Sequence, residues 1–435
     1  MIDIKHIRDN PQRFKGACKA KAFAVDIDRL LQVDSTLREC RQQLQDIATE
    51  KNRLGKSIPT LSADKKQSVL ERLSQLKQDE AKLQDQVKSL QPEFDGLMLL
   101  VPQPADDDVP LGKDDTENVE IRKEGEIRQF DFEPKDHVQL GLALGIIDVE
   151  RGVKLAGTRN YFLKADGALL HWAVLRFAMD LMIGKGYVPL SVPLLMKDEA
   201  MQGTGYYPGS EDQTYRMEKD QLNLAGTAEV PLTAYRMGEI LSPEELPLKY
   251  VALSSCFRRE AGAAGKDTYG LYRIHQFDKV EQVVICENSI EQSYRYHDEI
   301  LRNAEAVMQA LELPYRVVNV CTGDLGRGQA KKFDIEAWMP SRGNYCETHS
   351  ASKFYEFQAR RMNLRYKDPV TKKNLFCHTL NNTVIASPRI LIPILELYQN
   401  PDGSVTVPQV LRPYMNGKNK IVPAQGMEPG QSIRE

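Results

Sequence analysis

A seven-residue hydrophobic repeat constrains the first hundred residues more than any other pattern in the chain. Between residues 26 and 58 it fills two core positions of each heptad, with Val33, Cys40, Ile47 and Leu54 at one and Leu30, Leu37 and Leu44 at the other. A heptad repeat keeps one apolar seam facing a neighbouring helix, so this segment is predicted to be one strand of a coiled coil.

The repeat is interrupted once and then resumes. Gly55, Pro59 and Ser62 break it, and the second run consists of Val69, Leu76, Leu83, Leu90 and Leu97 with Leu73, Val87 and Phe94. So short a connection predicts an antiparallel helical hairpin over about 26–98, roughly 45–50 Å long, after a first helix over about 3–21. A dimerisation coiled coil is the alternative. The turn favours a hairpin that closes its own seam and leaves its outer faces free for a partner.

The composition is that of an ordinary soluble globular protein of several domains. A formal net charge of −3 over 435 residues argues against a protein that coats nucleic acid through a uniformly basic surface. Seven cysteines without a Cys-x-x-Cys pair indicate reduced thiols and a cytoplasmic location. The starting sequence lacks the apolar core of a signal peptide, and no later apolar run approaches 18 residues, so neither secretion nor a membrane span is expected.

The composition changes after residue 100. Residues 101–118 combine three prolines and five aspartates without an apolar period, which predicts a linker between an N-terminal domain (1–100) and a second domain (119–417). Residues 418–435 have the composition of a disordered tail.

Short β-rich runs and long helices alternate in the second domain. A helix is expected at about 167–185 and another at about 289–312, among strands near 250–256, 273–277, 283–286 and 315–320. This order predicts an α+β fold with an antiparallel sheet flanked by helices. A doubly wound nucleotide-binding fold is disfavoured, because no strand leads into a G-x-G-x-x-G turn.

Basic side chains and glycines concentrate between Cys256 and Glu281. Arg258, Arg259, Lys266 and Arg273 surround a Gly-bearing hairpin. Guanidinium groups pair with phosphate oxygens and glycine lets a ligand approach the backbone, so this stretch is predicted to bind a polyphosphate. It is not a P-loop, because only two residues separate Gly262 from Gly265.

Five ordered segments resemble the bacterial type of seryl-tRNA synthetase, a class II aminoacyl-tRNA synthetase family. They are a helix and strand ending at Val192-Pro193, the T-x-E run from Gly226 to Glu229, the F-R-x-E run Phe257 to Glu260, the segment 347–361, and residues 378–389 with 407–415. Together with the heptads, the resemblance covers residues 1–417. It implies a class II catalytic domain that forms seryl-adenylate from serine and ATP and then charges tRNA(Ser).

The resemblance also implies residue roles. Arg258 and Arg389 are the expected catalytic residues, because fixed positive charge lets the serine carboxylate approach the α-phosphate. The ATP-binding set that it implies is Arg258, Arg259, Glu260, Arg273, Ile274, Phe277, Glu347, Thr348, His349, Ser350 and Arg389. Within that set, Glu347 and Ser350 are expected to help hold Mg²⁺ through the nucleotide.

Serine recognition must exclude alanine and threonine. Hydrogen-bonding the substrate hydroxyl is the stronger discriminator, since an unpaired buried acceptor costs more than a missing methylene. The resemblance assigns the hydroxyl to Glu281 and Thr383, and it places Thr227, Ala228, Glu229 and Arg258 around the rest of the amino acid.

The chain departs from the usual family pattern N-G-S-G-L-A-V-G-R near residue 389. Asn382 and Val384 replace glycines, which predicts a tighter floor of the serine pocket, and Thr383 adds a methyl group. Ser387-Pro388 is expected to form the N-cap and first turn of the following helix. The hairpin of residues 258–273 carries Lys266 and Tyr269 where arginines are usual.

Two cysteine and histidine pairs raise the question of a metal site. Cys346 and His349, with Cys377 and His378, offer a weak zinc hypothesis, because structural zinc sites usually show two regularly spaced ligand pairs. The resemblance implies a homodimer and a hairpin that binds the long variable arm of the tRNA, and it leaves open whether tRNA(Sec) is also charged. The rival functions are a carrier-protein ligase and a catalytically weak tRNA-binding paralogue. The intact hairpin argues against the first, and the retained charged residues argue against the second.

Overall fold

The computed structural model describes residues 1–262, 267 and 269–423, apart from the side chains of residues 60 and 63. The chain forms two compact units, Met1–Pro104 and Ala105–Glu435. Residues 424–435 of the predicted tail lie outside the described residues.

The first unit is entirely helical. It contains α1 (Ile4–Asp9), α2 (Pro11–Ala20), α3 (Ile27–Ser57) and α4 (Ala63–Leu100). The expectation of one helix over 3–21 is wrong, because the chain restarts at Asn10. The Asn10 side chain accepts the Arg13 N–H at 3.1 Å, and Pro11 has no N–H to continue the preceding helix.

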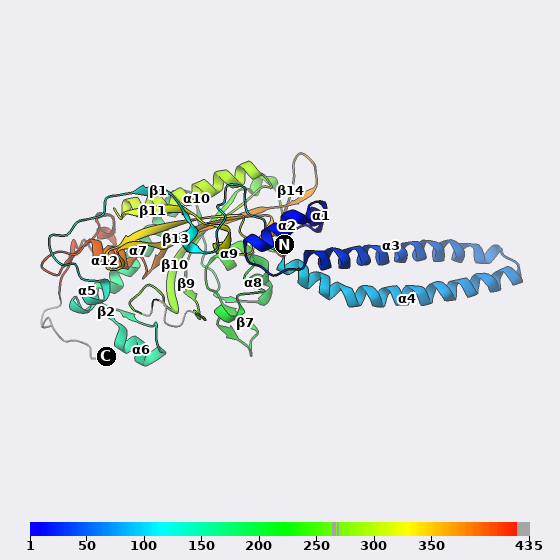
Figure 1. Ribbon diagram of the computed structural model, residues 1–435, viewed down its shortest axis with the longest axis horizontal. Helices are drawn as coiled ribbons and strands as arrows, with labels where there is room; N and C mark the ends of the chain where they lie inside the picture. Colours follow the sequence, from blue (N-terminus) through cyan, green and yellow to red (C-terminus); the bar gives the residue numbers. More distant parts are fainter. Residues whose placement is uncertain (263–266, 268, 424–435) are drawn as a thin grey trace. The chain divides into compact units, whose positions relative to one another are not determined.

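The predicted hairpin is confirmed in α3 and α4 (Figure 1). Their heptad side chains are buried or half-buried, and the turn is the 3₁₀ segment Ile58–Thr60. Cross-helix ion pairs fix the antiparallel register: Arg29 Nε meets Glu93 Oε1 at 2.6 Å, and Arg72 Nε meets Glu50 Oε1 at 3.0 Å. The hairpin therefore satisfies its own apolar seam.

The second unit is built on an eight-stranded sheet, which confirms the α+β prediction. Every neighbouring pair is antiparallel except β4 and β9. In spatial order the strands are β1 (Val119–Glu124), β11 (Tyr315–Asn319), β12 (Lys331–Met339), β13 (Asn344–Tyr355), β16 (His378–Ser387), β10 (Gln276–Cys286), β9 (Leu248–Phe257) and β4 (Val188–Pro189).

Side chains alternate between the two faces of β10, and this alternation separates core from site. Asp278 contacts His171 of α7 (Asp166–Gly184), and Gln282 donates to the Ile300 carbonyl of α10 (Ile290–Ala310), so the even-numbered residues face these helices. The odd-numbered residues face the opposite side. The main hydrophobic core lies between the sheet and the two helices (Figure 1).

Helix α7 is a longer apolar segment than expected from the sequence, since no run approaching 18 residues was predicted. It is the one described helix that is long and apolar enough to cross a membrane, with a mean hydropathy of 1.3. Its buried side chains, including Leu170, Val174, Ala178 and Met182, belong to the main core. Its hydrophobicity is therefore explained by packing under the sheet.

Smaller elements surround the sheet. The helices are α5 (His137–Ala143), α6 (Val149–Ala156), α8 (Asp198–Thr204), α9 (Glu229–Ala234), α11 (Phe357–Met362) and α12 (Leu391–Leu397). The short strands are β2 (Ile147–Asp148), β3 (Phe162–Leu163), β5 (Leu195–Met196), β6 (Arg216–Met217), β7 (Leu222–Leu224), β8 (Ile240–Leu241), β14 (Arg365–Lys367), β15 (Asn374–Phe376), β17 (Val405–Thr406) and β18 (Lys420–Ile421).

Two predicted boundaries move in the structure. Most of the predicted linker packs on the second unit, because Asp106 forms an ion pair at 2.6 Å with the fully buried Lys353 and Asp108 pairs with Lys331. The predicted tail begins too early at 418, since Lys420 and Ile421 pair with β17. The second unit therefore spans 105 to at least 421.

Candidate functional site

A polar cavity opens on the odd-numbered face of β10, bordered by the ends of β13 and β16. Its lining gathers much of the predicted site: Arg258, Glu260, Leu271, Tyr272, Arg273, Ile274, Phe277, Lys279, Glu347, Thr348, Thr383, Ala386 and Arg389. Four cationic side chains stand against two carboxylates in this set. The cavity therefore favours an anionic guest.

Aromatic rings and carbonyls hold the cations in place. The Arg258 guanidinium lies 5.1 Å from the Phe277 ring centroid, and its Nε donates to the Gly226 carbonyl at 3.3 Å. The Arg389 guanidinium lies 4.4 Å from the Tyr272 ring centroid. Such cation–π contacts keep a guanidinium flat against a ring while its other N–H groups stay available to a ligand.

Two carboxylates line the same cavity. Glu260 accepts from Arg273 Nη1 at 2.5 Å. Partial desolvation opposes ionisation of Glu347, but this residue remains exposed to solvent, and the positive charges of Arg389 and Lys332 lower its pKa. Glu347 is therefore ionised at neutral pH.

A buried polar pocket lies beside the cavity. Lys279 and Glu281, only 5% and 1% exposed, form an ion pair between Nζ and Oε2. Lys279 also donates to the hydroxyls of Thr227 at 2.8 Å and Thr383 at 3.3 Å. Charges and hydroxyls so enclosed suit a small zwitterion that carries a hydroxyl group.

Glu229 stands behind this pocket at the start of α9. Its carboxylate accepts from Tyr206 at 3.0 Å and from Gln358 at 2.8 Å. Burial raises the pKa of Glu229 to about 7, and the negative charge of Glu281 adds to the increase. A cationic ligand group beside Glu229 would lower its pKa again and favour the ionised carboxylate.

Several predicted site residues do not line the cavity. Arg259 turns toward the Asp212 carbonyl, 3.3 Å from its Nη1. His349 is buried against the Thr348 hydroxyl at 2.8 Å, and burial lowers its pKa to about 4. Ser350 is half-buried on β13 outside the lining. Lys266 lies outside the described residues.

The predicted tight floor of the serine pocket is wrong. Asn382 Nδ2 donates to the Ile300 carbonyl at 2.6 Å, so this side chain faces α10, and Val384 is buried in the core on the same face. The reason is the alternation of β16 together with its bulge, which leaves Thr383 opposite Glu281 and turns its neighbours away.

The predicted N-cap at Ser387 is also wrong. Helix α12 begins at Leu391, and Ser387 is the last residue of β16. Its hydroxyl lies 2.8 Å from Nδ1 of His171, whose Nε2 lies 3.0 Å from Asp278. Ser387 therefore links the sheet to α7 instead of capping a helix.

The zinc hypothesis finds no ligand set. The described residues contain no group of three or more His, Cys, Asp or Glu placed to hold a metal ion. Cys377 is a core residue, and Nδ1 of His378 lies 2.6 Å from the Ser293 hydroxyl. These side chains are accounted for by packing and hydrogen bonding.

Sequence reasoning missed Lys279. Its spacing offered a signal, because Phe277, Lys279 and Glu281 are two residues apart and share one strand face. Tyr272 and Tyr206 were also missed, and no local pattern distinguishes them; Gln358 belongs to the segment 347–361 that carried the resemblance, but it was given no role.

Comparison with known proteins decides the family. Residues 1–104 match the model of the seryl-tRNA synthetase N-terminal domain, and residues 213–398 match that of the class II tRNA synthetase core domain (G, H, P, S and T). A serine–tRNA ligase of Deinococcus radiodurans is 45% identical, over 97% of this chain and 99% of its own length. The chain belongs to the seryl-tRNA synthetase family.

Solved structures of this family share the fold. A seryl-tRNA synthetase from Pyrococcus horikoshii complexed with ATP has a TM-score of 0.92 and 37% identity, over 98% of this chain and 100% of that one. The cytoplasmic serine–tRNA ligase from Naegleria fowleri in complex with AMP has a TM-score of 0.85 and 30% identity, over 95% and 96%. Both match the helical first unit and the sheet together.

Proposed function

We propose that this chain activates L-serine with ATP to form seryl-adenylate and pyrophosphate, and then transfers the seryl group to the 3′-terminal ribose of tRNA(Ser). The observation that carries the proposal is the junction of two environments. The buried pocket of Lys279, Glu281, Thr227 and Thr383 opens into a cavity whose lining adds three arginines, Arg258, Arg273 and Arg389. An amino acid and a polyphosphate could therefore meet at Arg258.

Arg258 is proposed to carry the activation step. The serine carboxylate attacks the α-phosphorus of ATP, forming a C–O–P bond while pyrophosphate leaves. Both reactants are anions, so a fixed cation between them lowers the barrier, and no general base is needed because the carboxylate is already ionised. The bond from Arg258 Nε to the Gly226 carbonyl orients the guanidinium beforehand.

The lining supports binding of ATP with Mg²⁺. Phe277 would stack on the base, Glu260 would hold the adenine end, and Arg273 and Arg389 would pair with the phosphates; all four side chains line the cavity. Bound Mg²⁺ would neutralise phosphate charge, and the ionised Glu347 would be its protein ligand. Ser350 would contribute only from outside the present lining.

Serine recognition is proposed for the buried pocket. Glu281 and Thr383 would bond the substrate hydroxyl, and Thr227, Glu229 and the backbone at Ala228 would surround its ammonium group. Lys279 Nζ already contacts the Thr227 and Thr383 hydroxyls, so a bound ammonium would compete with it at Thr227 and the substrate hydroxyl would compete with it at Thr383.

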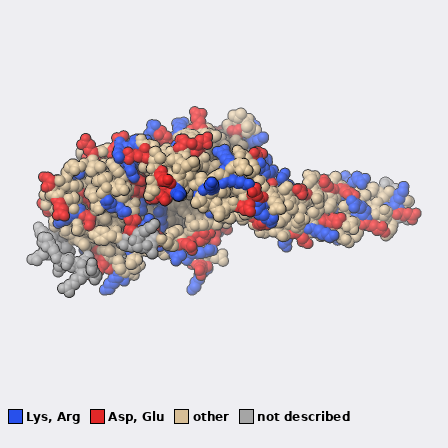
Figure 2. Space-filling view, in the orientation of Figure 1, with Lys and Arg blue, Asp and Glu red and all other residues tan. Residues whose placement is uncertain are grey.

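Partners are proposed from three observations. Along α3 and α4, basic and acidic side chains alternate on the face shown in Figure 2, which fits tRNA recognition by shape and scattered phosphate contacts. Trp172 and Leu155, 62% and 76% exposed, offer apolar surface for a homodimer. All seven cysteines are free and buried, which fits the cytoplasm.

Arg258→Ala tests the proposed reaction. Serine-dependent exchange of pyrophosphate into ATP should fall about 10²–10³-fold or more, as on loss of a preorganised charge contact. Arg216→Ala is the matched control, because Arg216 pairs with Asp198 and does not line the cavity, so this variant should retain activity within a few-fold. Equal effects of the two substitutions would contradict the proposal.

A shortened hairpin tests the role of the arm. Replacing residues 45–86 with a tight turn leaves the base of the hairpin intact, where Leu30, Val33 and Leu37 are buried. We expect nearly unchanged serine-dependent exchange and loss of tRNA(Ser) charging. Charging at the parent rate would refute the arm's role.

A further inference from the structure

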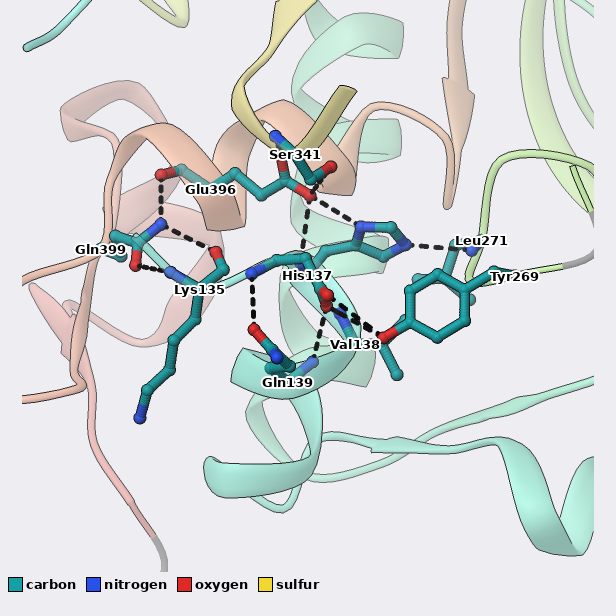
Figure 3. A network of polar contacts seen from close by, with 10 residues as sticks. Lys135, His137, Val138, Gln139, Tyr269, Leu271, Ser341, Glu396 and Gln399 are labelled. Atoms are coloured by element: carbon teal, nitrogen blue, oxygen red, sulfur yellow. Dashed lines mark hydrogen bonds and ion pairs between the residues drawn. The ribbon is translucent and has the colours of Figure 1, made fainter. Parts of the chain in front are cut away.

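We propose that His137 is a positioning residue for the ATP cavity: its imidazole joins the buried Glu396 to the backbone N–H of Leu271, the first residue of the segment 271–274 that lines the cavity ahead of β10. The inference rests on the proposed function, because it concerns the same nucleotide site. Figure 3 shows the network, which lies outside the residues that the reaction itself uses.

The geometry fixes which ring nitrogen carries the proton. His137 Nε2 lies 3.2 Å from the Leu271 nitrogen, and a backbone N–H can only donate, so Nε2 accepts. His137 Nδ1 lies 2.7 Å from Glu396 Oε1 and therefore donates to it. The network requires a neutral imidazole protonated at Nδ1. The two ring nitrogens thus serve two separate parts of the fold.

Glu396 is a rigid anchor for the ring. It lies on α12 with 0% exposure, and its carboxylate also accepts from the His137 backbone N–H at 3.0 Å. Ser341 adds two further bonds, from its backbone N–H at 2.9 Å and from its hydroxyl at 2.8 Å. Four donors satisfy the carboxylate, so His137 cannot turn without leaving Glu396 under-bonded.

The other side of the ring controls the cavity wall. Leu271, Tyr272, Arg273 and Ile274 line the cavity in succession, and Tyr272 supports the Arg389 guanidinium. A bond to the Leu271 N–H therefore sets the starting point of this wall. A displacement of Leu271 would also shift Tyr272, Arg273 and Ile274, which follow it in the chain.

The preceding turn is fitted to the imidazole. Gly270 has φ +74°, and a Cβ on it would lie 2.2 Å from His137 Nε2, so the backbone approaches the ring as closely as it can. On the residue before Gly270, the Tyr269 hydroxyl donates to the carboxylate of Asp136 at 3.2 Å. Asp136 and His137 thus hold Tyr269 and Leu271, the residues on either side of Gly270.

Two substitutions separate the two halves of the network. In His137→Asn the side-chain amide reaches the Nδ1 position, so the Glu396 bond can persist while the acceptor for Leu271 is lost. In His137→Gln the amide oxygen reaches the Nε2 position, so the reverse holds. We expect His137→Asn to raise the KM for ATP about tenfold, as for one lost acceptor of a buried N–H, with kcat within about twofold. His137→Gln should keep the parent KM and lower the melting temperature.

Ser341→Ala is the matched control, because it removes the hydroxyl bond to Glu396 and keeps the backbone N–H bond, without touching the 269–274 segment. It should lower the melting temperature and leave the KM for ATP unchanged. Amide hydrogen exchange of the peptide containing Leu271 should accelerate in His137→Asn alone. If the His137 variants do not fold, Gly270→Ala, which pushes against Nε2 and leaves Glu396 intact, should raise the KM for ATP instead.

The outcomes are distinct. An unchanged ATP affinity in His137→Asn, by exchange kinetics and by calorimetry of ATP alone, would overturn the proposal, as would equal KM increases in the Asn and Gln variants. For Gly270→Ala, a parent-like KM would do the same. A parent enzyme that binds ATP but shows no serine-dependent exchange would refute the proposed function, and calorimetry would still test His137.

Discussion

Replacing Lys279 with methionine should expose the energetic logic of the serine pocket. Lys279 and Glu281 are 5% and 1% exposed, so the substitution removes the partner of an almost fully buried carboxylate. Glu281 Oε2 would keep only a long contact with the Thr383 hydroxyl, at 3.4 Å. Breaking a buried pair in this way costs about 3–5 kcal/mol. We expect Lys279→Met to lose that amount of unfolding free energy at pH 8.

The loss should depend on pH in a defined direction. Burial already raises the pKa of Glu281, and removal of Lys279 raises it further. A carboxyl with a raised pKa binds more protons in the folded state, so stability decreases as pH rises from the unfolded value of about 4.3 through the folded value. The deficit of Lys279→Met should therefore be smaller at pH 5.5 than at pH 8.

Urea unfolding followed by tryptophan fluorescence measures these differences, and a double variant supplies the control. Lys279→Met with Glu281→Leu removes both charges and should return to within about 1–2 kcal/mol of the parent. Serine-dependent exchange should be lost in both proteins. A single variant that loses less than about 1 kcal/mol at pH 8, or a double variant less stable than the single one, would refute the reasoning.

Three further predictions address individual contacts. Burial raises the pKa of Glu229 to about 7, and an ammonium ligand needs the ionised form. The KM for serine should therefore rise about tenfold from pH 8 to pH 6, while the KM for ATP stays unchanged. Glu229→Gln should abolish the pH dependence of the KM for serine. Thr383→Val deletes a hydroxyl beside Glu281 and should weaken serine use about 5- to 150-fold but alanine use much less, and equal losses in parallel exchange assays would make Thr383 merely structural. Ser387→Val leaves His171 Nδ1 without its partner and should cost about 1–3 kcal/mol in urea unfolding, whereas an unchanged midpoint would mean that the contact contributes nothing.

The parts of the fold that depend on local patterns could be predicted from the sequence. The hairpin follows from heptads that are contiguous along the chain, and its turn follows from Pro59. The main strands and helices of the second unit also carry their own signals. Boundaries were less predictable, because Asp106 belongs to the second unit only through an ion pair with Lys353, far away in sequence.

The candidate site could be predicted only as far as motif resemblance reached. Lys279 completes its pocket through the register between β10 and β16 and through the turn that carries Thr227, and the bulge in β16 decides which way Asn382 and Val384 point. The role of His137 depends on Leu271 and Glu396, which are 134 and 259 residues away. No local pattern reports contacts of that kind.

The most direct test of the central claim is amino-acid-dependent exchange of pyrophosphate into ATP by the full-length chain, measured with serine, threonine, alanine and cysteine side by side. Serine should support exchange far better than alanine, because the buried Glu281 and Thr383 are left without a hydroxyl partner when alanine binds. Exchange that proceeds equally with alanine, or that needs no amino acid, would contradict the assignment of this pocket to serine.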